Sequence, residues 1–248
     1  MENQENRIII DYFSFVSNCD NEKTILRLLD LTGLPFEESA GMHFYKKSLR
    51  YCVDGSTCII ILYGGHEYKD YYTNKKLCDD NVCVMMSGKG CRVFETNSKY
   101  SFMDLFAYIY DNPDDYNITR LDIAYDDFKG LLDINTLAFD TFQQNYITKS
   151  RTWKVETGSA GTSIYFGSDK SPILLRIYDK KAEQKITDED LHWVRVELQL
   201  RDDRASNAVK YINSGICIDE VYFNALNNFI RFVEKSETDS NKYRHKLK

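Results

Sequence analysis

The sequence predicts an α+β fold with a broad antiparallel β-sheet, built from two similar strand-helix-strand halves with helices packed on one face. Two observations lead to this prediction. Amphipathic segments with a period of two residues recur along the chain, and elements follow in a similar order on each side of a turn-forming stretch, YDNPDDYN, at residues 110–117. With 248 residues, 43% of them hydrophobic, the chain can build a core. We therefore expect half-units at 1–112 and 113–248 within one compact domain.

The first half supplies strands and helices in the order that its hydrophobic patterning predicts. Apolar residues that alternate with polar ones indicate strands, and apolar residues at three- and four-residue spacing indicate helices. The predicted elements are a strand over 7–17, a helix over 22–33, two or three strands within 43–64, a strand over 82–95 and a helix over about 100–110.

The second half repeats the pattern of a strand, a helix and further strands. Its strands are short and rich in β-branched and aromatic residues, which is typical of sheets. The predicted elements are a strand over 119–128, a helix over 134–145, strands over 153–158, 162–167, 173–181 and 193–201, and helices over about 206–213 and 219–234. The charged stretch 235–248 is expected to be a solvated tail.

Composition limits the possible functions. Seven cysteines, an odd number without a CxxC pair, suggest neither a disulfide framework nor a zinc site. The four histidines form no HxH or HExxH motif, so no histidine-based metal site is visible. No apolar run approaches the ~20 residues that span a bilayer, and the first residues lack signal-peptide features, so we expect a cytoplasmic protein. The net charge of −6 argues against binding nucleic acid by bulk charge but permits a local basic patch.

Three predicted strands in the second half each carry one polar face. If the strands TRLDIAYDD, LLRIYDKK and WVRVELQLR are neighbours, four reactive side chains lie together with five cations around them. Carboxylates in contact repel unless a cation lies between them, and oxygen ligands suit Mg²⁺ or Mn²⁺. The four are Asp122, Asp126, Glu197 and Tyr178, and the cations are Arg120, Arg176, Lys180, Arg195 and Arg201.

Each of these residues also has a structural interpretation. Alternating charges on strands are usually a solvated face with cross-strand ion pairs. Asp126 and Asp127 could cap a turn, and Tyr178 could be one of many structural tyrosines. A free phenol has a pKa near 10, so Tyr178 would need a metal ion or neighbouring cations to attack as a phenolate.

Four segments resemble the Rep_trans family, which contains rolling-circle plasmid replication initiators and the relaxases of conjugative elements and is related to HUH endonucleases. The resemblance runs from about residue 7 to residue 241. The paired histidines of ordinary HUH enzymes are absent from this family and from this chain. The segments are MSGKGCRVFE, TRLDIAYDDF, TSIYFGSDKSPILLRIYDKKAEQ and WVRVELQLRDDRA.

The resemblance implies a metal-dependent DNA strand transferase. One strand is cut through a 5′-phosphotyrosyl link that leaves a free 3′-hydroxyl. Tyr178 is the implied nucleophile, with Arg176 and Lys180 stabilising charge. Asp122, Asp126 and Glu197 are the implied ligands of Mg²⁺ or Mn²⁺, in the second half-unit.

DNA is the implied partner, as a single strand or a cruciform origin, with a helicase or a second copy of the chain as further candidates. The first half-unit is expected to contact it. Its segment 63–76 mixes tyrosines with lysines, a composition that suits base stacking and phosphate contact, although a solvated hairpin or loop is the slightly favoured interpretation. The predicted DNA-binding residues are Lys89, Arg92, Arg120, Arg195, Arg201, Tyr68 and Lys69.

Two other functions remain open from the sequence. A sequence-specific DNA-binding module on the same scaffold would keep its function in Tyr178→Phe. A metal nuclease that activates water would release DNA with a free 5′-phosphate and form no covalent adduct.

Overall fold

The computed structural model describes residues 5–235 and 243–245. Contacts divide the chain into two compact units: unit 1 comprises residues 1–9, 123–200 and 216–248, and unit 2 comprises residues 10–122 and 201–215. The boundaries fall inside three strands, β1 (Arg7–Ser17), β7 (Tyr116–Asp127) and β12 (Val194–Arg201). Each unit is therefore assembled from separate stretches of sequence. The predicted half-units at 1–112 and 113–248 stay a prediction.

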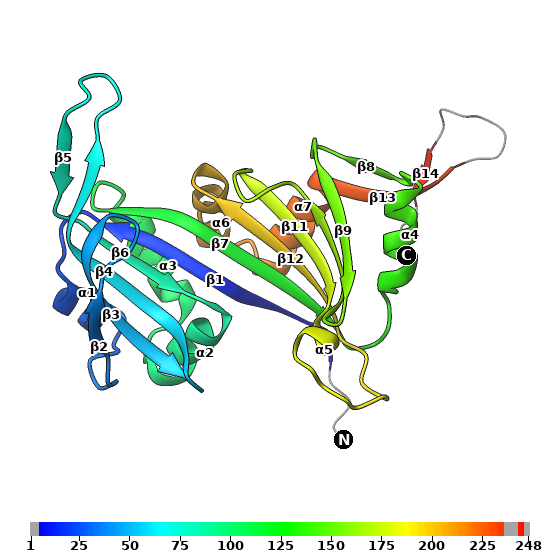
Figure 1. Ribbon diagram of the computed structural model, residues 1–248, viewed down its shortest axis with the longest axis horizontal. Helices are drawn as coiled ribbons and strands as arrows, with labels where there is room; N and C mark the ends of the chain where they lie inside the picture. Colours follow the sequence, from blue (N-terminus) through cyan, green and yellow to red (C-terminus); the bar gives the residue numbers. More distant parts are fainter. Residues whose placement is uncertain (1–4, 236–242, 246–248) are drawn as a thin grey trace. The chain divides into compact units, whose positions relative to one another are not determined.

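A large β-sheet is the main feature of the fold (Figure 1). Its strands hydrogen-bond in the order β2-β3-β4-β6-β1-β7-β12-β11-β10-β9, and β5 pairs with β4. Neighbouring strands such as β11 and β12 are antiparallel, so the predicted fold class of a broad antiparallel sheet with helices is confirmed. The other strands are β2 (Glu37–Ala40), β3 (Tyr45–Val53), β4 (Ser56–Lys69), β5 (Lys76–Asp79), β6 (Val82–Met86), β9 (Trp153–Gly158), β10 (Gly161–Phe166) and β11 (Ile173–Asp179).

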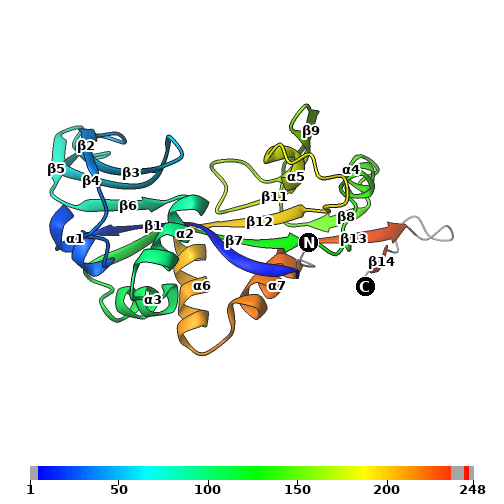
Figure 2. The same ribbon diagram turned by 90° about the horizontal axis from the view of Figure 1, so that it is seen from below.

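Unit 2 packs its helices around an aromatic core. The rings of Phe13 and Phe106 lie 5.1 Å apart, those of Phe94 and Phe102 lie 4.9 Å apart, and all four are almost fully buried. Such rings supply a large part of the burial energy of a core. The helices are α1 (Glu22–Leu28), α2 (Gly88–Asn97), α3 (Phe102–Asp111) and α6 (Asp203–Asn213), of which α3 and α6 lie side by side (Figure 2).

The strand predicted over residues 82–95 is partly wrong, because the chain leaves β6 at Met86 and forms helix α2. Close packing at two glycines explains the change. A Cβ at Gly90 would lie 2.1 Å from the carbonyl oxygen of Cys58, and one at Gly88 would lie 2.6 Å from the Asp11 carboxylate. Only glycine allows the start of α2 to approach its neighbours so closely.

Unit 1 holds α4 (Ile134–Phe142), the short α5 (Lys180–Glu183) and α7 (Ile218–Phe229). The helix predicted over 219–234 ends earlier, because the chain becomes strand β13 (Ile230–Lys235), which pairs with β8 (Tyr146–Thr148). The buried Tyr222 of α7 donates a 2.8 Å hydrogen bond to the carbonyl of Val196 and so ties the helix to β12. Of the predicted tail, only Lys235 and the short strand β14 (Tyr243–His245) lie within the described residues.

Candidate active site

Tyr178 lies near the end of β11, next to β12. The register of the two strands sets Arg176 opposite Glu197 and Tyr178 opposite Arg195. The Tyr178 side chain is only 2% exposed, and its hydroxyl donates a 3.2 Å hydrogen bond to Oε2 of the half-buried Glu197. The phenol proton therefore already points at a carboxylate that could receive it.

Two cations lie against the Tyr178 ring. The guanidinium carbon of Arg176 is 3.8 Å from the ring centroid, and Nζ of Lys180 is 5.4 Å from it. Lys180 also pairs with Glu183 at 2.8 Å. Within the described residues, Nε of Arg176 is buried without a hydrogen-bond partner. A half-buried guanidinium with spare donors is a ready partner for phosphate oxygens.

Asp126 occupies the centre of a hydrogen-bond network in unit 1. Its Oδ1 accepts bonds from Nε of Arg195 at 2.6 Å and Nε1 of Trp193 at 2.7 Å. Its Oδ2 accepts bonds from Nη2 of Arg195 at 2.9 Å and Nε of Arg7 at 3.1 Å. Burial acts to raise the pKa of Asp126, but these donors outweigh it and hold the pKa below its usual value. The carboxylate stays ionised and is fully engaged by protein donors.

The turn-capping interpretation applies to the neighbour of Asp126. Asp127 accepts bonds from the backbone N–H groups of Leu132 at 2.7 Å and Lys129 at 3.1 Å, and His192 lies 3.3 Å from its Oδ2. Asp127 therefore shapes the loop that follows β7, whereas Asp126 points into the network described above.

Asp122 belongs to unit 2 and forms an ion pair there. Arg120 donates from Nε and Nη2 to its two oxygens at 2.6–3.2 Å, and the same guanidinium lies 4.1 Å from the Tyr12 ring centroid. Burial raises the pKa of Asp122 to about 6, although Arg120 opposes the shift. Desolvation thus outweighs the ion pair in setting the charge of this carboxyl.

The raised pKa predicts how stability depends on pH. Folded Asp122 holds its proton up to about pH 6, whereas in the unfolded chain the carboxyl releases it near pH 3.8. The contribution of Asp122 to stability is therefore greatest below pH 4 and is lost as the pH rises to 6. Asp122→Asn removes this loss. We expect the free energy of unfolding of the wild type, measured relative to Asp122→Asn, to fall by up to about 3 kcal/mol between pH 4 and 7.

Urea unfolding at several pH values measures this difference. The exposed Asp114, also in unit 2, offers a control in Asp114→Asn, whose difference from the wild type should stay constant over the same range. A difference that is equally flat for Asp122→Asn would contradict the prediction.

The predicted DNA-binding cations lie in varied surroundings. Arg195 is only 4% exposed and donates to Asp126, so little of its surface is accessible to a phosphate. Lys89 is exposed beside Asp54 at 3.4 Å, and Arg92 bonds to the Ile10 carbonyl and to Glu95. The remaining predicted residues include Arg201, which is half-buried with Nε unpartnered within the described chain, and the exposed Tyr68 and Lys69.

Sequence reasoning missed the partners that bury Asp126. Arg7 comes from β1 and Trp193 from the residue before β12, and neither showed a functional pattern. A signal was available in the WVRVELQLR segment. It places two side chains that donate hydrogen bonds, Trp193 and Arg195, close to a single carboxylate, Glu197.

The described residues contain no cluster of three or more His, Cys, Asp or Glu side chains that could hold a metal ion. Of the predicted ligands, Glu197 is the one beside Tyr178, and its oxygen donors suit a hard divalent ion. Asp126 would first have to release protein donors. In the described segments, no helix combines the length and the apolar character that crossing a membrane requires.

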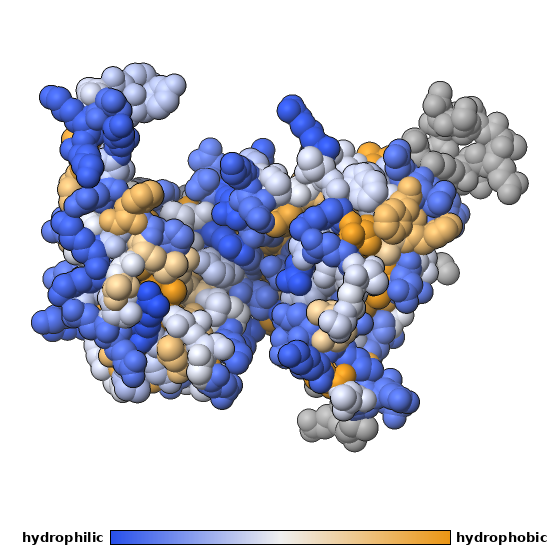
Figure 3. Space-filling view, in the orientation of Figure 1, coloured by the Kyte–Doolittle hydropathy of each residue, from blue (hydrophilic) through white to orange (hydrophobic). Residues whose placement is uncertain are grey.

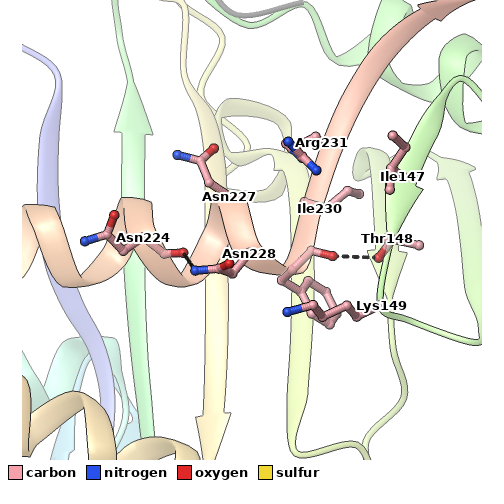
Figure 4. A pocket seen from close by; sticks show the side chains of 9 residues that line it. Ile147, Thr148, Lys149, Asn224, Asn227, Asn228, Ile230 and Arg231 are labelled. Carbon is pink, nitrogen blue, oxygen red and sulfur yellow. Dashed lines mark hydrogen bonds between the residues drawn. The ribbon is translucent and has the colours of Figure 1, made fainter. Parts of the chain in front are cut away.

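Unit 1 also has a pocket that none of the predicted site residues lines (Figure 4). It is lined partly by Asn224, Asn227 and Asn228 of α7, with Lys149 and Arg231. The two cations lie beside the C-terminal end of α7, where positive charge is favourable in any helix. This arrangement explains them without a ligand.

The comparisons with known proteins agree with the sequence resemblance. The family model of the replication initiation factor, Rep_trans, matches residues 116–248, more than half of the chain. The chain is 33% identical over 176 residues to the DNA relaxase NicK of Bacillus subtilis (strain 168), an alignment that covers 64% of this chain and 49% of that protein. A rolling circle replication initiator protein from Geobacillus stearothermophilus has a similar structure, with a TM-score of 0.79 and 25% identity over 98% of this chain and 93% of that chain.

The sheet and the matching segments define the class of replication initiators and relaxases. The chain belongs to the Rep_trans family of replication initiation factors. Members of this family are generally metal-dependent. The chain spans about half the length of the relative NicK.

Proposed function

We propose that this protein is a tyrosine-dependent, single-strand DNA endonuclease that nicks an origin and so initiates rolling-circle replication or conjugative transfer. One observation carries the proposal: in a chain of this family, the hydroxyl of Tyr178 bonds to Glu197 while the Arg176 guanidinium covers its ring. A nucleophile, a proton acceptor and a phosphate-binding cation thus occur together in one unit.

The reaction is a transesterification. Oη of Tyr178 forms a bond to the scissile phosphorus, and the bond from phosphorus to the 3′-oxygen breaks. The phenol proton passes to Glu197, and the departing 3′-oxygen is released as a hydroxyl after it takes up a proton from solvent. Because one phosphoester replaces another, the 3′-hydroxyl can reverse the reaction and rejoin the strand.

Arg176 and Lys180 stabilise the negative charge that develops on the phenolate and on the phosphoryl oxygens. Glu197 would be the residue best placed to hold Mg²⁺ or Mn²⁺ near Tyr178, and a bound ion would polarise a phosphoryl oxygen. The ligand roles predicted for Asp122 and Asp126 stay predictions.

Tyr178 is buried, so a phosphate needs access to its hydroxyl. Two of the groups that lie against the ring are the long side chains of Arg176 and Lys180. Such side chains change rotamer rapidly, and a phosphodiester offers their charges a better partner than an aromatic face. DNA binding would then uncover the nucleophile without a change in the sheet.

A covalent adduct is the test. The protein is incubated with a pool of single-stranded oligonucleotides and Mn²⁺ and then run on a denaturing gel. A metal-dependent slower band, with the attached peptide mapped to residue 178, supports the proposal. Cleaved DNA without an adduct would favour the water-activating nuclease, and binding without cleavage would favour the DNA-binding module. A helicase and a homodimer stay candidate partners.

A further inference from the structure

A β-hairpin in unit 2 projects from the rest of that unit (Figure 1). It is formed by the end of β4 and by β5, with Tyr68 opposite Leu77 and Lys69 opposite Lys76. In Figure 3 it appears as a narrow extension of the surface. The two strands are joined by residues 70–75.

Two tyrosines at the tip of this hairpin are almost fully exposed. Tyr71 is 90% and Tyr72 is 92% exposed, and their rings pack edge to face with centroids 5.4 Å apart. Exposed tyrosines of this degree bury little area and contribute little to the core. Two aromatic faces presented together to solvent suit a partner that stacks on them.

The turn holds these tyrosines in place. The backbone N–H of Asp70 donates to the carbonyl of Lys75 at 2.9 Å, and the carbonyl of Asp70 accepts from the N–H of Asn74 at 2.9 Å. The Asp70 carboxylate accepts from the N–H of Thr73 at 2.6 Å. The tip is therefore preorganised, which lowers the entropy lost on binding.

The lysines next to the tip are arranged unfavourably for an isolated protein. Lys69 and Lys76 are directly opposite each other across the hairpin, and Lys75 is adjacent. Like charges in opposed positions destabilise a strand pair. None of the three lysines forms an ion pair within residues 5–235. Residues 68–76 contain three lysines and one aspartate, a net charge of +2, in a chain whose net charge is −6. An anion bound at this position would relieve the repulsion.

We propose that the hairpin tip binds single-stranded DNA, with Tyr71 and Tyr72 stacking on bases and Lys69 and Lys76 contacting phosphates. The inference rests on the proposed function for its choice of DNA. Aromatic faces combined with cations are the usual recognition elements for single strands. A protein partner is disfavoured because lysine is depleted in protein interfaces. A single strand is favoured over a duplex because bases expose their faces only when they are unstacked.

Fluorescence anisotropy with a labelled oligonucleotide tests the proposal on the full chain. We expect Tyr71→Ala/Tyr72→Ala to weaken binding about tenfold or more, and Tyr71→Phe/Tyr72→Phe to retain it, because stacking uses the ring. A matched control, Tyr110→Ala/Tyr211→Ala, removes two exposed tyrosines from helices of the same unit and should bind as the wild type does.

Lysine variants test the phosphate contacts separately. Lys69→Gln/Lys76→Gln should reduce the slope of log K against log salt by about 1.4, since each phosphate contact to a single strand contributes about 0.7. An unchanged slope together with unchanged affinity of the alanine pair would overturn the proposal. Equal weakening for a blunt duplex would also overturn it, because it would remove the preference for single strands.

The adduct assay separates this inference from the proposed function. At saturating DNA, Tyr71→Ala/Tyr72→Ala should still form the covalent adduct, because Tyr178 is intact. If the wild type forms no adduct but loses affinity with the tip tyrosines, the nicking function fails and the hairpin site stands. If the wild type forms the adduct and the tip variants bind DNA normally, the nicking function stands and the hairpin site fails.

Discussion

Replacing Tyr178 by phenylalanine should abolish the covalent DNA adduct and reduce strand cleavage by about 10³-fold or more, while leaving the fold intact. The substitution removes the oxygen that we propose as the nucleophile and nothing else, so the variant has no nucleophile at this position. The buried ring and its contact with Arg176 are retained. The 3.2 Å bond to Glu197 is lost, at a cost of about 1 kcal/mol.

Tyr165→Phe provides the matched control. Tyr165 lies on the neighbouring strand β10, directly opposite Arg176, and the guanidinium of Arg176 is 5.6 Å from its ring. The control therefore removes a phenol near the same cation but away from Glu197, and it should form the adduct normally. Adduct formation and thermal unfolding are measured for both variants. An adduct that persists in Tyr178→Phe would show that another residue is the nucleophile and would refute the assignment of Tyr178.

Local patterning was enough to predict much of the sheet. The strand predicted over 7–17 coincides with β1, and that over 153–158 coincides with β9. The polar site depended on the condition that the segments carrying Asp126, Glu197 and Tyr178 are neighbours, and the order β7-β12-β11 meets this condition. Period-two alternation determines which side chains share a face, so these predictions needed no long-range information.

What the sequence could not predict depends on contacts between distant segments. A solvated surface was one interpretation of the polar face, but Asp126 and Arg195 are almost fully buried. Arg7 and Trp193, both distant from Asp126 in the sequence, donate hydrogen bonds to its carboxylate. Strand register, which brings the Tyr178 hydroxyl to Glu197, cannot be deduced from alternation alone. The start of helix α2 also depends on distant segments, because its two glycines pack closely against Cys58 and Asp11.

Asp126→Ala should destabilise the protein by about 3–5 kcal/mol, the largest effect on stability that we expect from one substitution at the site. Both oxygens of Asp126 accept hydrogen bonds, and the Arg195 side chain that they neutralise is 5% exposed. Alanine would take the Asp126 carboxylate away from a buried guanidinium, and desolvation then opposes folding. The same carboxylate has a lowered pKa, so its stabilising contribution is lost as the pH falls through that pKa.

A double variant separates the buried ion pair from other causes. Asp126→Leu/Arg195→Met replaces both charges by apolar groups and should be more stable than Asp126→Ala, whereas Asp169→Ala at an exposed position of unit 1 should change stability by less than about 0.5 kcal/mol. Urea unfolding measures all three. If Asp126→Ala unfolds like the wild type but loses affinity for Mn²⁺ by calorimetry, Asp126 is a metal ligand after all. Destabilisation with Mn²⁺ binding retained would assign it to the framework that holds β7 against β12.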